Sequence, residues 1–388
     1  MTSAAPEEVD PVERARALAP LVREAADEAE RERRLPARVA EAMADAGLYR
    51  VAAPREMGGA ERDPCTQIRT IEAIAEADGS AGWNLMIGIE NFGLVTLGFP
   101  RGAELFADPR VILCGSTAAV GKAERVPGGF RVSGRWSFVS GCHNAHFLSA
   151  LAMPHENGEP VVGEAAQFMI MPRSEWEILD TWNVSGLRGS GSHDVRAEDV
   201  FVPEENTASF GRPTVRPKVP IARIPIGTRL AYNKVGVALG IARAAIDHFV
   251  ELASGKTPRF SSAKLRERAH VQHAIARAEA RVRGARAFVL ESAETVWQAA
   301  LEDRLPTPQE KALLQLACSD AAGGCAEAVD WIAEAAGTSA NLLGSPLERQ
   351  ARDIRVIRQH VTVAPQHFDD AGRVLLGLPP EGLMLSMG

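Results

Sequence analysis

Disulfide pairs, long apolar runs and an excess of basic residues are all missing from this chain, and each absence excludes a class of protein. The five cysteines form no CxxC pair, and their odd number argues against a complete disulfide framework, which favours a reducing, cytoplasmic setting. No run of about eighteen apolar residues is free of charge, and no basic region precedes an apolar core at the N-terminus. We therefore expect neither a membrane span nor secretion.

The charge balance is mildly acidic. The chain carries 43 Lys and Arg against 50 Asp and Glu, for a formal net charge of −7 at pH 7, so nucleic acid is not an expected partner. Hydrophobic residues make up 46% and charged residues 24% of the sequence, which indicates well-filled globular cores rather than wholesale disorder.

The first part of the chain has helical periodicity. Residues 11–47 predict two amphipathic helices that are separated at Pro36, because a proline restricts the residue before it. Further helices are expected over residues 64–77 and 80–99, with Ser80 as the cap of the second. The first hundred residues therefore predict a helical unit.

From Val111 the pattern changes to short β-rich runs punctuated by glycine. These runs are VILCGST, GGFRVSGRWSFVS, FLSALAMP, AAQFMIM, WEILDTW and VRAEDVFVP. Four prolines between Thr207 and Pro225 then indicate an exposed connector. Beyond Ile226, apolar positions return every three or four residues as far as Leu376, which predicts a bundle of four or five long helices.

The sequence thus predicts an α+β protein that is mainly helical. We expect an N-terminal helical domain over residues 1–110, a middle β-barrel-like domain over residues 111–210 and a C-terminal helical bundle over residues 211–388.

No metal site is expected. His143 and His146 are three residues apart in an expected strand, which places them on opposite faces. His270 and His273 share a helical face but have no obvious third ligand.

Three segments resemble one known family. They are GRWSFVSGCHNAHF at 134–147, DTWNVSGLRGSGSHDVRAEDVFVPE at 180–204 and AAGTSANLLGSPLERQARDIRVIRQH at 335–360. In order and spacing they are similar to the acyl-CoA dehydrogenase superfamily, in its branch of reduced-flavin-dependent monooxygenases. The resemblance covers nearly the whole chain. It implies a homotetramer with reduced FAD or FMN held between the β domain and the helical bundle.

The resemblance assigns flavin contacts within SFVSG. Ser140 corresponds to the hydroxyl near flavin N5, Phe138 to the aromatic that flanks the ring, and Val139 lies between them. In a strand, Phe138 and Ser140 would point the same way. The alternative for Ser140 is a serine that bonds its own loop. Trp136 would lie on the same face, although a tryptophan at such a position is more often packed in the hydrophobic core.

Two glycine- and serine-rich segments, GSTAAVG at 115–121 and RGSGSH at 188–193, are expected as loops whose backbone N–H groups bind flavin, with Gly115 and Ser116 as contacts. GSGSHD lacks the third glycine and the strand-to-helix setting of a dinucleotide fingerprint, so no nicotinamide site is expected. Electrons would then come from a separate NAD(P)H-dependent flavin reductase.

His360 is the candidate for proton transfer, because an ordinary imidazole pKa of about 6.5 permits proton uptake near neutrality. On a helix expected from Pro346 to about Ala364, it shares a face with Val356 and Ile357 and points inward. The alternative is a core histidine bonded to a backbone carbonyl. One dehydrogenase lineage places a catalytic glutamate on this segment, whereas the sequence here has His360, Val361 and Thr362.

Trp83, Asn84 and Asn91 are candidate substrate contacts on the helix over 80–99, although solvent exposure is the alternative for both asparagines. Glu90 stands near a position where several relatives carry a histidine, which argues against a two-histidine substrate clamp.

Family resemblance also extends the flavin site to two distant segments. Arg259, Arg266 and Gln272 lie where relatives bind flavin phosphates, and a charged helix surface is the alternative for them. A second group, Gly337, Thr338 and Ser339, matches a loop that reaches the cofactor of a neighbouring subunit.

The function predicted from these features is a flavin-dependent monooxygenase. It would use reduced flavin and O2 to hydroxylate a small aromatic substrate, indole-like or phenolic, through a C4a-hydroperoxyflavin. One rival is an FAD-containing acyl-CoA dehydrogenase or oxidase, for which Glu251 is an available carboxylate, although a solvated helix residue is the more ordinary role. The other rival is a flavin-free helical binding scaffold.

Overall fold

The computed structural model describes residues 10–94, 98–210 and 219–386. Within them, helices precede and follow one sheet, so the mainly helical α+β fold class is confirmed. The N-terminal helices are α1 (Pro11–Glu32), α2 (Ala37–Asp45), α3 (Pro64–Ala75), α4 (Gly79–Leu94) and α5 (Gly102–Leu105). The C-terminal helices are α6 (Ile226–Gly255), α7 (Ala269–Leu301), α8 (Pro308–Ala336), α9 (Pro346–Ile357), α10 (His367–Leu375) and α11 (Leu383–Ser386).

The N-terminal helices begin and end where local chemistry favours it. Pro36 separates α1 from α2, as predicted. Asp63 caps α3 by accepting a hydrogen bond from the Thr66 N–H at 2.9 Å. The prediction that Ser80 caps α4 was wrong, because the Asp78 carboxylate accepts from the Ala81 N–H at 2.8 Å instead.

Eight strands form one open sheet in the order β6-β7-β2-β1-β3-β5-β8, with β4 paired to β3. They are β1 (Leu113–Val126), β2 (Gly129–Trp136), β3 (Phe147–Glu156), β4 (Glu159–Pro160), β5 (Gln167–Pro172), β6 (Glu177–Leu179), β7 (Asp194–Pro203) and β8 (Thr207–Ser209). The sheet has its own core, in which Trp136 is fully buried and donates from Nε1 to the Leu151 carbonyl at 2.8 Å.

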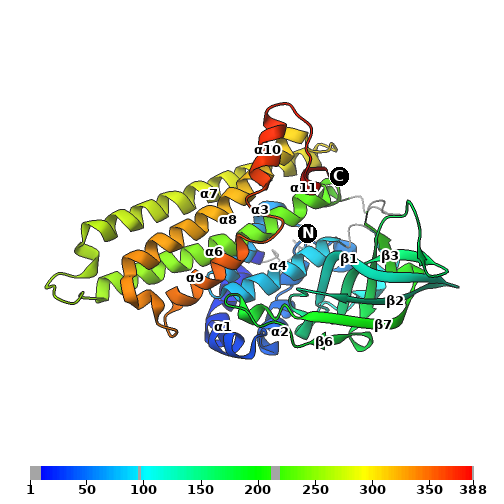
Figure 1. The fold of residues 1–388 in the computed structure, drawn as a ribbon, viewed down its shortest axis with the longest axis horizontal. Helices are drawn as coiled ribbons and strands as arrows, with labels where there is room; N and C mark the ends of the chain where they lie inside the picture. Colours follow the sequence, from blue (N-terminus) through cyan, green and yellow to red (C-terminus); the bar gives the residue numbers. More distant parts are fainter. Residues whose placement is uncertain (1–9, 95–97, 211–218, 387–388) are drawn as a thin grey trace, which may run out of the picture.

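Helix α4 lies between the sheet and the C-terminal helices, as Figure 1 shows. It packs against β1 on one side and α6 on the other, and nearly all of its residues are buried. Figure 1 also shows the long helices α6, α7 and α8 extending away from the sheet, so that the α6–α7 connection lies at the far end of the molecule. A site between sheet and bundle must therefore involve α4.

Some expected features fall outside the described residues. Pro213 and Pro217 of the expected connector belong to the segment 211–218, which the structure does not describe. Among the described residues, no helix is long and apolar enough to cross a membrane.

Candidate functional site

Three predicted site residues meet at one place between the sheet and the helices. The indole Nε1 of Trp83, on α4, donates to the Ser140 hydroxyl at 2.9 Å. The same indole lies edge-on to the His360 imidazole, with the ring centroids 5.4 Å apart. Trp83 therefore connects the loop that follows β2 to the turn that follows α9.

A chain of buried hydroxyl groups continues from Ser140. Its Oγ lies 2.6 Å from the Ser192 Oγ, which lies 2.7 Å from the Ser190 Oγ, and all three serines are at most 4% exposed. An indole N–H can only donate, so the Ser140 oxygen accepts from Trp83 and keeps its own proton for Ser192 or for a ligand. Ser190 and Ser192 were not predicted as site residues, because the backbone N–H groups of their loop, and not its hydroxyl groups, were expected to bind flavin.

Those backbone N–H groups are already used within the loops. The Ser190 N–H donates to the Leu187 carbonyl at 3.0 Å and the His193 N–H to the Gly191 carbonyl at 2.8 Å. The prediction that RGSGSH offers free N–H donors is therefore wrong at these two positions, and the serine hydroxyls are the groups that point inward.

The SFVSG segment is a loop rather than a strand, so its side chains do not alternate as predicted. Phe138 has a left-handed φ of 59° and is 71% exposed, whereas Ser140 is 3% exposed. A left-handed phenylalanine costs roughly 1–2 kcal/mol, which is typical of functional loops. Val139 is buried in the sheet core, and its N–H donates to the His193 carbonyl, so its side chain cannot reach a ligand.

His360 does not lie on a helix. Helix α9 ends at Ile357, and His360 belongs to the turn that leads to α10, which corrects the predicted helix from Pro346 to Ala364. Burial, with the positive charge of Lys234 as the second cause, lowers the His360 pKa to about 3. The ring is therefore neutral at any ordinary pH, in contrast to the predicted acceptor with a pKa near neutrality.

A buried ion pair lies next to this group. The ammonium of Lys234, on α6, contacts the carboxylate of Glu90, on α4, and both side chains are at most 8% exposed. Burial raises the Glu90 pKa and lowers the Lys234 pKa, and the mutual attraction opposes both shifts. Lys234 was not among the predicted site residues, although a single lysine within the apolar run YNKVGVALGIA is itself a sign of a buried charge.

Both candidate asparagines are buried and neither faces solvent. The Asn84 amide donates to the Ser80 carbonyl at 2.9 Å and lies 3.4 Å from the carbonyls of Gly189 and Ser190. The Asn91 amide donates to the Ile87 carbonyl at 2.9 Å. Their N–H groups therefore brace the backbone around the site, which weakens the prediction that they bind substrate.

The GSTAAVG segment belongs to β1 and is not a loop. Pairing with β3 shifts between Ser116 and Gly121, so residues 117–120 bulge out of the ladder and are exposed. Gly115 precedes this bulge at a crowded point, where an added Cβ would lie 2.2 Å from Asn91 Oδ1. Ser116 Oγ accepts from the Ala118 N–H at 3.3 Å and so shapes the bulge.

A cavity of about 680 Å³ lies beside the turn between α9 and α10, residues 358–366, here called the His360 turn. The bulge of β1 borders it through Thr117 and Ala118, and the turn borders it through Val361 and Thr362. Its remaining walls include the apolar side chains Phe210, Leu230, Leu383 and Met384. The lining also includes the charged residues Asp369, Asp370, Arg373 and Glu381. The volume lies within the usual range for small-molecule sites, and the lining suits a ligand with both apolar and polar parts.

The distant flavin candidates lie at the other end of the bundle within one chain (Figure 1). Arg259 is exposed and stacks on Phe260, with its guanidinium carbon 4.9 Å from the ring centroid, while the Gln272 amide donates to the Arg266 carbonyl at 3.2 Å. Gly337, Thr338 and Ser339 form the 3₁₀ turn η10 (Gly337–Asn341), where the Ser339 hydroxyl accepts from Lys256 at 2.8 Å. None of these residues meets Ser140 in the same chain.

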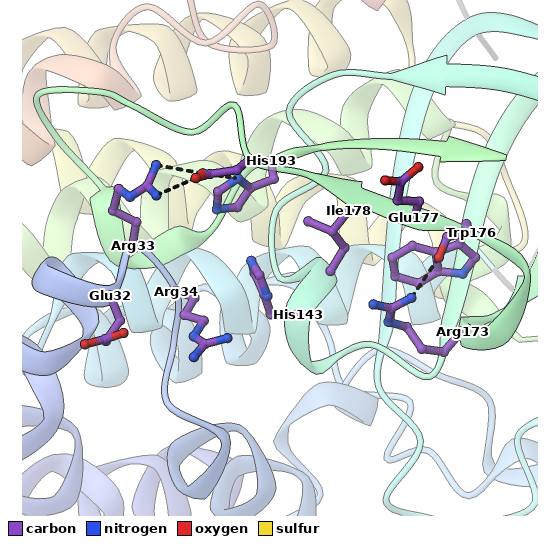
Figure 2. Close-up of a pocket in the computed structure, with 10 residues that line it drawn as sticks. Glu32, Arg33, Arg34, His143, Arg173, Trp176, Glu177, Ile178 and His193 are labelled. Atoms are coloured by element: carbon purple, nitrogen blue, oxygen red, sulfur yellow. Dashed lines mark hydrogen bonds and ion pairs between the residues drawn. The ribbon is translucent and has the colours of Figure 1, made fainter.

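A second cavity, of about 640 Å³, opens on the outer side of the serine loops. Figure 2 shows His143 and His193 approaching each other there, with ring centroids 5.0 Å apart, while Arg33 pairs with Asp180 at 2.8 Å. Burial is the main cause that lowers the His143 pKa to about 4. Trp83, Ser140 and His360 line neither this cavity nor the one of about 680 Å³, but the latter is lined by Val361 and Thr362, which directly follow His360.

The structure also places the residues considered for other chemistry. His143 lies in the 3₁₀ turn η4 (Cys142–Asn144) rather than in a strand, and the described residues contain no group of three or more His, Cys, Asp or Glu side chains that could hold a metal ion. Glu251 is exposed on α6, as expected for a solvated helix residue.

A buried carboxylate on α9 supports the loop between β6 and β7. Asp353, on α9, accepts from the Leu187 N–H at 2.6 Å and is 2% exposed. Burial, followed by the negative charge of Asp78, raises its pKa to about 7. Other charges acting on Asp353 come from Glu30, which raises the pKa further, and from Arg352, which opposes the shift.

We expect Asp353→Asn to stabilise the protein at pH 8 by about 1–2 kcal/mol, because asparagine keeps an acceptor for Leu187 without a charge. The folded state binds the Asp353 proton more tightly than the unfolded state, so the stability this proton provides is lost as pH rises through about 7. Urea unfolding at pH 6 and pH 8 measures the difference, with exposed Asp369→Asn as the control. An identical pH dependence in wild type and Asp353→Asn would contradict the assignment.

Comparisons with known proteins bear on the family and the fold of the chain. The family models for the acyl-CoA dehydrogenase N-terminal and C-terminal domains match residues 7–98 and 233–365. The chain is 34% identical over 356 residues to indole-3-acetate monooxygenase of Pseudomonas putida, which covers 91% of this chain and 90% of that protein. It is 28% identical over 396 residues to the oxygenase component of an FADH2-dependent resorcinol hydroxylase from a Rhizobium species, covering 96% and 95%.

A solved structure has the same fold. XiaF from a Streptomyces species, in complex with FADH2 and glycerol, superposes with a TM-score of 0.89 at 26% identity and covers 97% of each chain.

Proposed function

This chain belongs to the acyl-CoA dehydrogenase superfamily, in its branch of flavin-dependent monooxygenases, and from that premise we propose that it is the oxygenase component of a two-component aromatic hydroxylase. The observation that carries the proposal is the meeting of the buried Ser140 and Trp83 with the half-buried His360 between sheet and bundle. When bound there, reduced FAD or FMN supplies the electrons that activate dioxygen.

The residues around this place fit a flavin ring. Phe138 is an exposed apolar side chain held outward by a left-handed backbone, and its ring meets that of Trp182 with centroids 6.0 Å apart. Such a surface suits a planar aromatic group, and the buried Ser140 hydroxyl two residues on offers a polar contact at its edge. Gly115 and Ser116 would contribute through the β1 backbone.

The flavin phosphates would be held by a second copy of the chain. Arg259 belongs to the α6–α7 connection and Gln272 to the first turn of α7, and this end of the bundle lies away from the sheet (Figure 1). The turn at residues 337–339 follows α8. In a homotetramer these segments would reach the cofactor of a neighbour. A mixed-subunit experiment tests this, because Arg259→Ala chains and Ser140→Ala chains would restore each other's activity when assembled together.

A small aromatic compound is the proposed substrate. The cavity beside the His360 turn has apolar and charged side chains in its lining and is large enough for one or two fused rings, and the named activities of the two relatives concern indole-3-acetate and resorcinol. A separate NAD(P)H-dependent reductase would supply the reduced flavin. The dehydrogenase alternative is disfavoured, because the apolar Val361 follows His360 and Glu251 is exposed on α6.

Direct assay tests this proposal. The protein is supplied with O2 and with NADH, FAD and an unrelated flavin reductase, then incubated separately with indole-3-acetate and with resorcinol. Mass spectrometry is expected to show a product one oxygen atom heavier with at least one compound. Reduction of a tightly bound flavin by an acyl-CoA, without hydroxylation of either aromatic, would overturn it.

A further inference from the structure

The two ring nitrogens of His360 have different surroundings. Its Nδ1 lies 3.3 Å from the backbone nitrogen of Thr362 and 3.0 Å from the Thr362 hydroxyl. A backbone N–H can only donate, so Nδ1 must accept and carries no proton. The proton of the neutral imidazole is therefore on Nε2, for which the described residues provide no partner.

The turn that holds Nδ1 is fixed from two sides. The Gln315 amide, on α8, donates to the Thr362 carbonyl at 2.8 Å, and the His367 ring lies 2.7 Å from the Val361 carbonyl. Thr362 and Gln315 are both at most 5% exposed. The position of Thr362 is thus set by α8 and α10 rather than by the local sequence of the turn.

The charges around the ring also favour its neutral form. Lys234 of α6 acts on His360 as a positive charge, while Glu90 of α4 is engaged by Lys234. Trp83, also of α4, presents an aromatic edge contact and no charge. His367 of α10 is directed at a backbone carbonyl. A carboxylate bonded to the ring would favour the doubly protonated imidazole. None of these neighbours places a carboxylate in hydrogen-bond contact with the ring.

We propose that Thr362 is a positioning residue, which holds His360 as the Nε2–H tautomer so that the imidazole meets the substrate as a hydrogen-bond donor. The atom it recognises is then an acceptor, such as a hydroxyl oxygen or its anion on the aromatic ring. The role toward substrate rests on the proposed function, whereas the tautomer does not. His360 would act without taking up a proton at any step of binding.

Solid-state NMR tests the tautomer without flavin or substrate. The protein is labelled with 15N-histidine, and the His360 signals are identified by comparison with His360→Gln. We expect a neutral ring with its proton on Nε2 throughout pH 5.5–8.5, because the ring pKa is about 3. A proton on Nδ1, or a doubly protonated ring between about pH 6 and 7, would overturn the inference.

Thr362→Val tests the hydroxyl, because valine has nearly the same shape, and Thr362→Ser is the matched control that keeps the hydroxyl. We expect kcat/KM for hydroxylation to fall about tenfold in Thr362→Val and to stay within about twofold in Thr362→Ser, with flavin affinity unchanged in both. The valine variant keeps the Thr362 backbone N–H, so its ring should stay in the Nε2–H tautomer, while the His360 NMR signals should broaden because the hydroxyl contact is lost.

The two failures are distinguishable. Equally sharp His360 signals and equal kcat/KM in the valine and serine variants would refute the role of the hydroxyl. A wild-type Nε2–H tautomer in a protein that hydroxylates no aromatic compound would instead refute the proposed function and leave the tautomer assignment intact.

Discussion

Glu90→Gln is expected to lower the free energy of unfolding by about 3–5 kcal/mol, because it leaves the Lys234 ammonium buried without its counter-charge. Both side chains are at most 8% exposed, so water cannot replace the lost partner. The remaining lysine must lose its proton or draw water into the interior, and either response is costly. Urea unfolding followed by circular dichroism measures the loss.

Two controls separate this effect from a simple loss of charge. The exposed pair between Glu13 and Arg16 has side chains 58% and 63% exposed, so Glu13→Gln should change stability by less than about 0.5 kcal/mol. Replacing both buried partners, as Glu90→Leu with Lys234→Met, should recover most of the lost stability. A Glu90→Gln variant as stable as the wild type would show that the pair is hydrated or unpaired.

His360→Ala is expected to lower kcat for hydroxylation by about 10²–10³-fold, the usual cost of removing one well-placed donor from a site that excludes water. Flavin binding should stay unchanged, because the ring contacts Trp83 and Thr362 and no predicted phosphate ligand. More of the oxygen consumed should then be released as hydrogen peroxide. Single-turnover measurements of product and peroxide test all three outcomes.

His360→Gln supplies a side-chain N–H in place of Nε2–H, so it should recover part of the activity that alanine loses. His155, on β3, bonds to the Met153 carbonyl and lies outside the site, so His155→Ala should leave kcat unchanged. Equal rates and equal peroxide release in wild type and His360→Ala would make His360 a structural residue.

Features with a local cause could be predicted from the sequence. Pro36 divides α1 from α2 because its ring restricts the preceding backbone, and α3 begins at Pro64, where the sequence predicted a helix to start. The placement of Trp83, Ser140 and His360 close together also agrees with the family resemblance, because the order of segments determines which elements adjoin the sheet.

Features that depend on contacts between distant parts of the chain could not be predicted from the sequence. Helix α9 ends at Ile357, and the turn that follows has its Thr362 carbonyl bound by Gln315 of the distant helix α8, a contact that the local sequence RDIRVIRQHVTVAP does not reveal. Likewise, alternation predicts similar surroundings for Phe138 and Ser140, whereas Phe138 has a left-handed backbone and is exposed while Ser140 is buried. The His360 pKa depends on burial and on Lys234, neither of which sequence spacing reveals.

The measurement that tests the central claim most directly is rapid mixing of the protein and reduced FAD with oxygenated buffer, followed by absorbance. A monooxygenase of this kind is expected to form a transient species that absorbs in the near ultraviolet and outlives any species seen with free reduced FAD. The Ser140→Ala variant should shorten that lifetime about tenfold, because one hydrogen bond is lost. Oxidation of reduced FAD at the same rate and with the same spectra, with or without the protein, would contradict the account.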